Sequence, residues 1–154
     1  MDLLDVLQEY CLAAFKRGVD LVVVSDAGSM LDVALPGFNG LGISTDQLAH
    51  YCKGQGCPQG RCLPILLDVG THPERYEKGR YWGLQQAPLQ GSLLRQAHLA
   101  LKQAVSQVWP DARVIFDDCC HVLALTRYQK VAKVQMPSAR LVCPFHHVSV
   151  LLIR

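Results

Sequence analysis

The sequence has little charge, no long apolar run and no concentration of basic residues. Only 18% of its 154 residues are charged, while half are apolar, and the net charge is +2. The apolar content excludes a disordered chain. The lack of basic runs interleaved with aromatic residues gives no indication of nucleic-acid binding, and no apolar run approaches the ~18 residues that indicate a membrane span. What remains is a chain long enough for one compact domain with its own core.

The first residues of the sequence give no indication of a targeting segment. Residues 1–5 read MDLLD, which is acidic where a secretory or transit peptide is basic. Seven cysteines are present, an odd number. Without a secretory signal they are expected to be reduced thiols rather than a disulfide framework. These features predict a cytoplasmic protein, with a mitochondrial location as the alternative.

What is present is an alternation of apolar strands and amphipathic helices, which predicts an α/β fold with a mainly parallel sheet flanked by helices. The strands predicted by short apolar runs lie near residues 21–24, 63–69 and 113–117. The predicted helices span residues 2–17, 45–51, 92–108 and 119–131, the second and third capped by Thr45 and Ser92. The clearest apolar stripe belongs to the helix at 92–108 and consists of Leu93, Leu94, Ala97, Leu101, Ala104, Val105 and Val108.

Four aspartates follow or end the predicted strands, and they are Asp26, Asp68, Asp117 and Asp118. Because the carboxyl ends of parallel strands meet at one edge of a sheet, we expect all four at one end of the sheet, near the loop at 37–43. The adjacent carboxylates of Asp117 and Asp118 would repel unless a cation or hydrogen-bond donors lie between them. They are therefore candidate ligands for Mg²⁺ or Mn²⁺. The alternative is a polar loop in which Asp118 caps the next helix.

Cysteine recurs every five residues at Cys52, Cys57 and Cys62, with His50 close by. Thiolate and imidazole are the usual zinc ligands, so a zinc site is conceivable here. The spacing differs from the familiar C-x2-C arrangement, however, and no second pair of cysteines is present. The sequence therefore favours the interpretation that these cysteines are small buried apolar side chains. It favours the same interpretation for the Cys-Cys-His run at 119–121.

The glycines at 37–42 occur in the order G-x-x-G-x-G, within a Gly/Pro loop expected at 36–44. A dinucleotide-binding fingerprint needs the order G-x-G-x-x-G directly after a strand. The sequence therefore identifies no cofactor-binding residue.

Several blocks of the sequence together resemble the malic enzymes. "LVVVSDAG" is similar to the family's "VVTDGE", "NGLGISTDQLAHY" to "GMGIP-x-GKL-x-LY", "CLPILLDVGT" to "LPV-x-LDVGT", and "FDDCCH" to "FEDFA-N". The blocks follow the family's order between about Leu21 and Tyr128. The resemblance implies a malic-enzyme N-terminal, catalytic domain at residues 1–130, truncated and without the Rossmann cofactor domain. Residues 131–154 would then be a divergent tail.

The resemblance also implies a chemistry, the oxidative decarboxylation of malate to pyruvate and carbon dioxide with NAD or NADP and Mg²⁺ or Mn²⁺. In the family a lysine takes the hydroxyl proton, hydride passes to the nicotinamide, and the metal polarises the resulting carbonyl. Asp117 and Asp118 match the acid pair that supplies two of the family's three carboxylate metal ligands. Asp117 is one methylene shorter than the glutamate it replaces.

Two departures from the family bear directly on this chemistry. The arginine that binds the substrate carboxylate is replaced by Ser29, whose hydroxyl cannot make a bidentate charged contact. The lysine that serves as general base is replaced by Gln47, whose amide has no useful proton affinity. The catalytic tyrosine is expected upstream of residue 1, and the segment with the third metal ligand has no counterpart after Tyr128. We therefore expect little or no activity, and weak metal binding, from this chain alone.

The alternative to an enzyme is a binding module, a pseudoenzyme that pairs with a full-length homologue or forms a homo-oligomer. A third possibility is a chain without a function, produced by an imperfect gene structure. Malate or pyruvate is the small-molecule partner that the resemblance implies. No nucleic-acid or membrane partner is expected.

Overall fold

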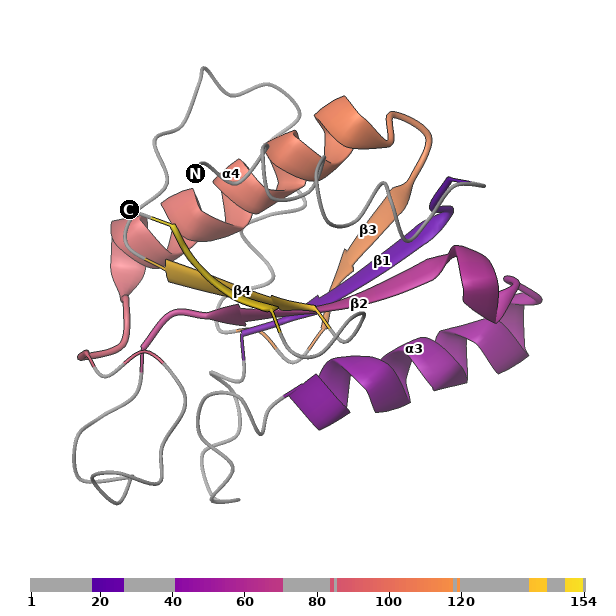
Figure 1. Cartoon of the computed structure of the whole chain (residues 1–154), viewed down its shortest axis with the longest axis horizontal. Coiled ribbons are helices and arrows are strands. Elements are labelled where there is room, and N and C mark those ends of the chain that lie inside the picture. Colours follow the sequence, from indigo (N-terminus) through magenta and orange to yellow (C-terminus); the bar gives the residue numbers. More distant parts are fainter. Residues whose placement is uncertain are drawn as a thin grey trace.

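A computed structural model describes residues 18–26, 41–70, 84, 86–117, 119, 139–143 and 149–153. These residues form a five-stranded sheet with a helix on each face (Figure 1). The elements in chain order are β1 (Leu21–Ser25), α3 (Leu41–Gln55), the 3-10 helix η3 (Gln59–Arg61), β2 (Cys62–Asp68), α4 (Gly91–Val108), β3 (Arg113–Phe116), β4 (Ala139–Cys143) and β5 (Ser149–Ile153). Among the described residues, no helix has the length and apolar character needed to cross a bilayer.

The sheet has the strand order β3-β1-β2-β4-β5. Strand β1 lies between β2 and β3 and is parallel to both, with Leu21 opposite Cys62 on one side and Arg113 on the other. The predicted α/β fold with three parallel strands is therefore confirmed. Strands β4 and β5 add to β2 in antiparallel pairs. They lie within residues 131–154, where no strand was predicted.

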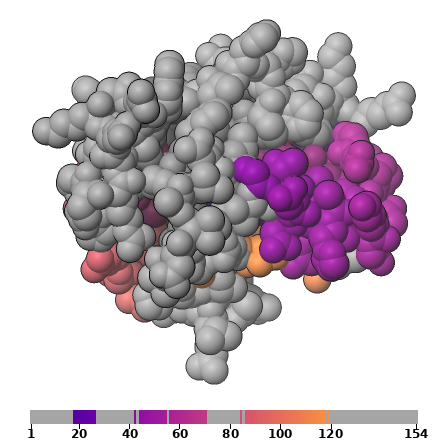
Figure 2. All heavy atoms as spheres, turned by 90° about the horizontal axis from the view of Figure 1, so that it is seen from below, coloured from indigo at the N-terminus to yellow at the C-terminus, as the bar shows by residue number. Residues whose placement is uncertain are grey.

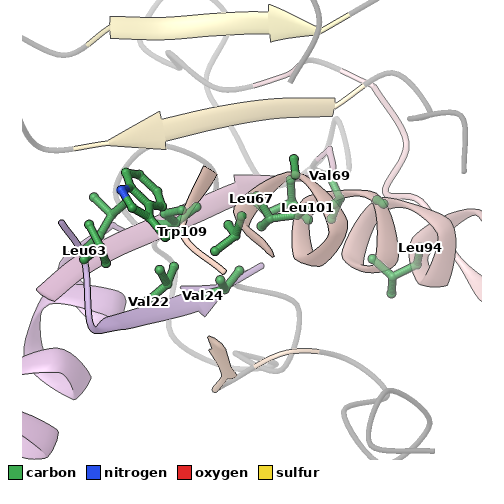
Figure 3. Packing of buried hydrophobic residues seen from close by; sticks show 13 residues of the cluster. Val22, Val24, Leu63, Leu67, Val69, Leu94, Leu101 and Trp109 are labelled. Atoms are coloured by element: carbon green, nitrogen blue, oxygen red, sulfur yellow. The ribbon is translucent and has the colours of Figure 1, made fainter. Parts of the chain in front are cut away.

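The face of the sheet covered by α4 holds the larger part of the core. Leu101 is completely buried on α4 and packs into one cluster with side chains from β1 and β2 (Figure 3). The members from the two strands alternate along the chain, as strand geometry requires, and are Val22, Val24, Leu63, Ile65 and Leu67. Trp109, which follows α4 directly, belongs to the same cluster and is 5% exposed.

The opposite face of the sheet is covered by α3. Leu48 and Cys52 of this helix pack against Leu21 and Val23 of β1, the strand residues that point away from α4. Strands β1 and β2 are thus buried on both faces, which explains why they read as continuous apolar runs, whereas β3 at the edge of the sheet is only partly buried.

Helix α3 begins at Leu41, so the loop predicted at 36–44 is wrong for its last four residues, and Thr45 is not the cap. Ser44 explains the error, because it is polar in sequence but buried in the structure, where its hydroxyl donates to the carbonyl oxygen of Ile65 at 2.8 Å. The helix also runs past Tyr51, to Gln55. Gly56 stops the helix directly after Gln55, because it has a φ of +67° and donates its N–H to the carbonyl oxygen of Cys52 at 3.1 Å.

The predicted cap and stripe of α4 need two corrections. The helix begins at Gly91 without a side-chain cap, so Ser92 lies inside it and is exposed. Leu93 was predicted to join the stripe but is 48% exposed, and His98 is buried on that face at 1% exposure. The helix predicted at 2–17, and the one at 119–131 apart from Cys119, lie outside the described residues.

We expect Leu101→Ala to lower the free energy of unfolding by about 2–5 kcal/mol, because it removes a completely buried side chain and leaves a cavity. Leu93→Ala on the exposed side of the same helix is the matched control, with an expected change within about 0.5 kcal/mol. Urea denaturation followed by circular dichroism measures both. Equal losses would show that α4 does not pack through the face that contains Leu101.

Candidate functional site

Three of the four predicted aspartates lie at one edge of the sheet. Asp26 follows β1, Asp68 ends β2 and Asp117 follows β3, and these three strands run parallel. Their carboxyl ends therefore reach the same edge, as the sequence predicts. Asp118 and Ser29 lie outside the described residues, as does the loop at 37–40.

At that edge, Asp26 belongs to the side of the sheet covered by α4. Its Oδ2 atom lies 2.8 Å from Nε2 of His98, and both side chains are almost completely buried. The imidazole ring packs against Phe116 at a centroid distance of 5.3 Å. Sequence analysis missed His98, although its position between Leu94 and Leu101 on the apolar stripe is a signal for a buried histidine.

Asp117 belongs to the other side of the sheet, which α3 covers. The hydroxyl group of Tyr51 donates a hydrogen bond of 3.0 Å to Oδ2 of Asp117. Burial raises the pKa of Tyr51 above its ordinary value, and the hydrogen bond and negative charge of Asp117 raise it further, while Arg113 opposes the shift. Figure 2 shows α3 (purple) at the surface, with part of the orange segment that includes β3 beside it.

The carboxylate of Asp68 is hydrogen-bonded to the backbone of the residues that follow β2. Its two carboxylate oxygens accept hydrogen bonds from the backbone N–H groups of Gly70, at 3.0 Å, and Leu84, at 2.6 Å. Gly70 has a φ of +107°, and a Cβ atom there would lie 2.7 Å from the carbonyl oxygen of Gln86. This turn therefore requires glycine, and Asp68 has a structural role in it.

Gln47 lies on α3 and is partly buried. It precedes Tyr51 by one helical turn, so the two residues share a side of the helix. This places the amide on the side of α3 from which Tyr51 reaches Asp117. An amide at this position can donate and accept hydrogen bonds but cannot hold a proton as a base does.

The described residues around Asp117 do not fit the magnesium or manganese ion that the resemblance implies. Hard cations of this kind need several oxygen ligands, and one oxygen of Asp117 already accepts the hydrogen bond from Tyr51. In the described part of the chain, the one group of three or more His, Cys, Asp or Glu side chains close enough to share a metal is Asp26, His98 and Cys119. That group has mixed donor atoms and does not include Asp117.

Three thiols that recur in the sequence meet in the structure. The Sγ atom of Cys62 lies 2.9 Å from that of Cys57 and 3.3 Å from that of Cys52. Burial raises the pKa of the Cys62 thiol, and hydrogen bonds with the other two thiols raise it further. Cys52 and Cys62 belong to the buried cluster beneath α3, in line with the interpretation as small buried side chains. His50 is exposed.

Comparisons with a family model and with known proteins both identify similarity to malic enzymes. The family described as malic enzyme, N-terminal domain, matches residues 3–131. The NAD-dependent malic enzyme of Shewanella halifaxensis is 33% identical over 104 residues, which cover 67% of this chain and 18% of that enzyme. The mitochondrial NAD-dependent malic enzyme of Amaranthus hypochondriacus is 34% identical over 113 residues, 73% of this chain and 18% of that enzyme. The chain thus spans about a fifth of the length of these relatives.

We expect Asp68→Asn to lower the free energy of unfolding by about 1–3 kcal/mol. The variant replaces a buried carboxylate oxygen that accepts a backbone N–H with an amide group that cannot accept it. Asp111→Asn, in an exposed turn, is the matched control and should change stability little. Urea denaturation measures both variants. A neutral Asp68→Asn would mean that the carboxylate does not hold this turn.

A second prediction concerns Tyr51. Asp117→Asn should lower the pKa of Tyr51 toward its ordinary value of 10.0, because the carboxylate both accepts the phenol proton and repels the phenolate. Since the folded-state pKa is raised, the stability that this proton contributes is present below pH 10 and is lost as pH rises through the folded-state pKa. NMR titration of ¹³C-labelled tyrosines measures the pKa, with Tyr51→Phe to assign the signal. An unchanged pKa in Asp117→Asn would contradict the contact.

Proposed function

The chain belongs to the malic enzyme family and matches its N-terminal domain. From this premise we propose that it is a malic-enzyme-like domain that does not oxidise malate by itself. The single observation that carries the proposal is Gln47, the residue at the position of the family's lysine base. It lies on α3, on the side from which Tyr51 reaches Asp117. A general base must accept the hydroxyl proton of malate, and an amide does not.

A second replacement supports the same proposal from the side of substrate binding. The family's arginine binds a substrate carboxylate with two parallel charged hydrogen bonds. Ser29 at this position offers one neutral hydroxyl, which is too short and carries no charge. We therefore propose that malate or pyruvate, the family's ligands, bind weakly to this chain.

The cofactors follow from the family as well. We propose NAD rather than NADP as the nucleotide of the ancestral reaction, because the relatives are named NAD-dependent malic enzymes. The family resemblance implies Asp117 and Asp118 as ligands for Mg²⁺ or Mn²⁺, but the described residues around Asp117 do not fit such an ion, so we propose no tight site there. Binding should be weak, since Asp117 is hydrogen-bonded to Tyr51 and two side chains leave most ligand positions to water.

The second candidate is a non-catalytic partner for a full-length malic enzyme. It is favoured by the contrast between a retained core and replaced reactive residues, because the strands and α4 still form a fully buried cluster. In this proposal residues 1–130 form the family-like domain and residues 131–154 extend it, with β4 and β5 added to the sheet beside β2. Co-sedimentation with a full-length homologue would distinguish it from a chain that acts alone. We propose the cytoplasm as its location, with the mitochondrion as the alternative.

The decisive experiment is a turnover assay of the purified 154-residue chain with malate, NAD or NADP, and Mn²⁺. We expect no malate-dependent NADH or NADPH above background, since loss of a general base alone costs ~10²–10⁴-fold. A full-length NAD-dependent malic enzyme serves as the positive control. Isothermal titration should show no tight Mn²⁺ site, and any weak binding should vanish in Asp118→Asn.

Turnover well above background by the purified chain would refute the proposal, and its loss in Gln47→Ala would further give the amide a role in the reaction. Micromolar Mn²⁺ binding that survives Asp118→Asn would show that the metal ligands are other residues.

A further inference from the structure

Three buried side chains of different chemistry meet at the carboxyl edge of the sheet, on the side covered by α4. They are Asp26, His98 and Cys119, and one potential ligand atom from each lies within 4.8 Å of the other two. Their exposures are 5%, 1% and 7%. We propose that these residues form a zinc site, distinct from the acidic metal site of the family.

The topology explains how the three residues come together. Asp26 follows β1 and Cys119 lies just beyond β3, and these strands are neighbours in parallel register, with Val24 opposite Phe116. His98 lies in the middle of α4, on the face that packs against the same strands. Two strand ends and one helix therefore supply one ligand each, and all three ligand residues are buried.

The donor atoms select the class of metal. One thiolate, one imidazole nitrogen and one carboxylate oxygen are all zinc ligands, and three protein ligands leave the fourth tetrahedral position for water or another ligand. Magnesium and manganese prefer oxygen ligands alone, so this set disfavours them. The charge also fits a buried site, because a thiolate and a carboxylate together neutralise Zn²⁺ while the imidazole stays neutral.

Without metal, hydrogen bonds hold the same groups in place. His98 Nε2 lies 2.8 Å from Asp26 Oδ2, and the single proton of the Cys119 thiol has two carbonyl acceptors in reach, that of Val24 at 3.4 Å and that of Asp117 at 3.5 Å. Zinc binding would break the contact between imidazole and carboxylate and form one bond to each of the three ligands. With Nε2 as the ligand, its proton is released to solvent and the other ring nitrogen, Nδ1, takes one up, so the imidazole stays neutral. The thiol proton leaves to solvent as the zinc–thiolate bond forms, so binding releases protons and strengthens as pH rises.

Among the described residues, the competing candidate for a soft metal is the pair of close thiol contacts that Cys62 makes with Cys52 and Cys57. The two sites differ in sulfur count, since the proposed site has one sulfur ligand and the thiols would supply two or more. They also differ in the substitution that would strongly weaken metal binding, which is Cys119→Ser for the proposed site and Cys57→Ser for the thiol group. This difference makes the proposal testable in the intact chain, and the site uses neither Gln47 nor Ser29, so it stands whether or not the chain oxidises malate.

The test is titration of the apo chain with Zn²⁺ and with Co²⁺, whose visible absorption reports tetrahedral geometry and whose near-ultraviolet band reports a thiolate ligand. We expect one equivalent to bind with one sulfur ligand in zinc X-ray absorption. Cys119→Ser, nearly equal in volume, should remove the thiolate band and weaken binding by roughly 100-fold or more, given that loss of even an outer-shell partner costs 10–100-fold. Cys57→Ser is the matched control and should leave both unchanged.

Loss of binding in Cys57→Ser but not in Cys119→Ser, or two or more sulfur ligands in the absorption spectrum, would overturn the proposal in favour of the thiol group. No binding of either ion would overturn it as well, and would leave Asp26 and His98 as a metal-free buried pair. The sulfur count is measured on the unmodified chain, so the proposal remains testable even if Cys119→Ser fails to fold.

Discussion

The parallel pairing of β1 with β2 on one side and with β3 on the other is the constraint on which the rest of the structure depends. It makes the three strands end at one edge, and it puts one helical crossover on each face of the sheet (Figure 1). The polar residues that follow the strands reach that edge because the strands preceding them are in register. The pairs that Asp26 makes with His98 and Asp117 with Tyr51 follow from this arrangement.

Asp26 and Asp117 reach the same edge of the sheet but lie on opposite faces of it. Asp26 pairs with His98 on the α4 side, whereas Asp117 pairs with Tyr51 on the α3 side. The first pair is buried in an apolar cluster, where an unpaired charge would cost several kcal/mol, and the second is partly open to water. One edge of the sheet therefore holds two polar environments, a dry one with mixed donor atoms and a wetter one with oxygen atoms.

The sequence predicts the three parallel strands and the edge that carries Asp26, Asp68 and Asp117, because buried strands read as short apolar runs that end in polar residues. It fails where tertiary packing overrides residue type. Ser44 can be buried because a carbonyl oxygen of β2 accepts its hydrogen bond. On α4, His98 is buried, whereas Leu93, predicted for the buried face, is exposed. The assignment of each aspartate to a face, and the approach of Cys119 to Asp26, depend on contacts between distant segments that no local pattern records.

Strand β2 lies between β1 and β4, and its two partners differ greatly in distance along the chain. β1 precedes it at residues 21–25, whereas β4 follows only at 139–143. During synthesis on the ribosome, the chain can pair β1 with β2 and then β3 with β1 long before β4 emerges. In that interval the free edge of β2 presents unpaired N–H and C=O groups, the kind of edge that recruits strands from other chains. The antiparallel strands β4 and β5 then cover this edge of β2 and move the open edge of the sheet to β5.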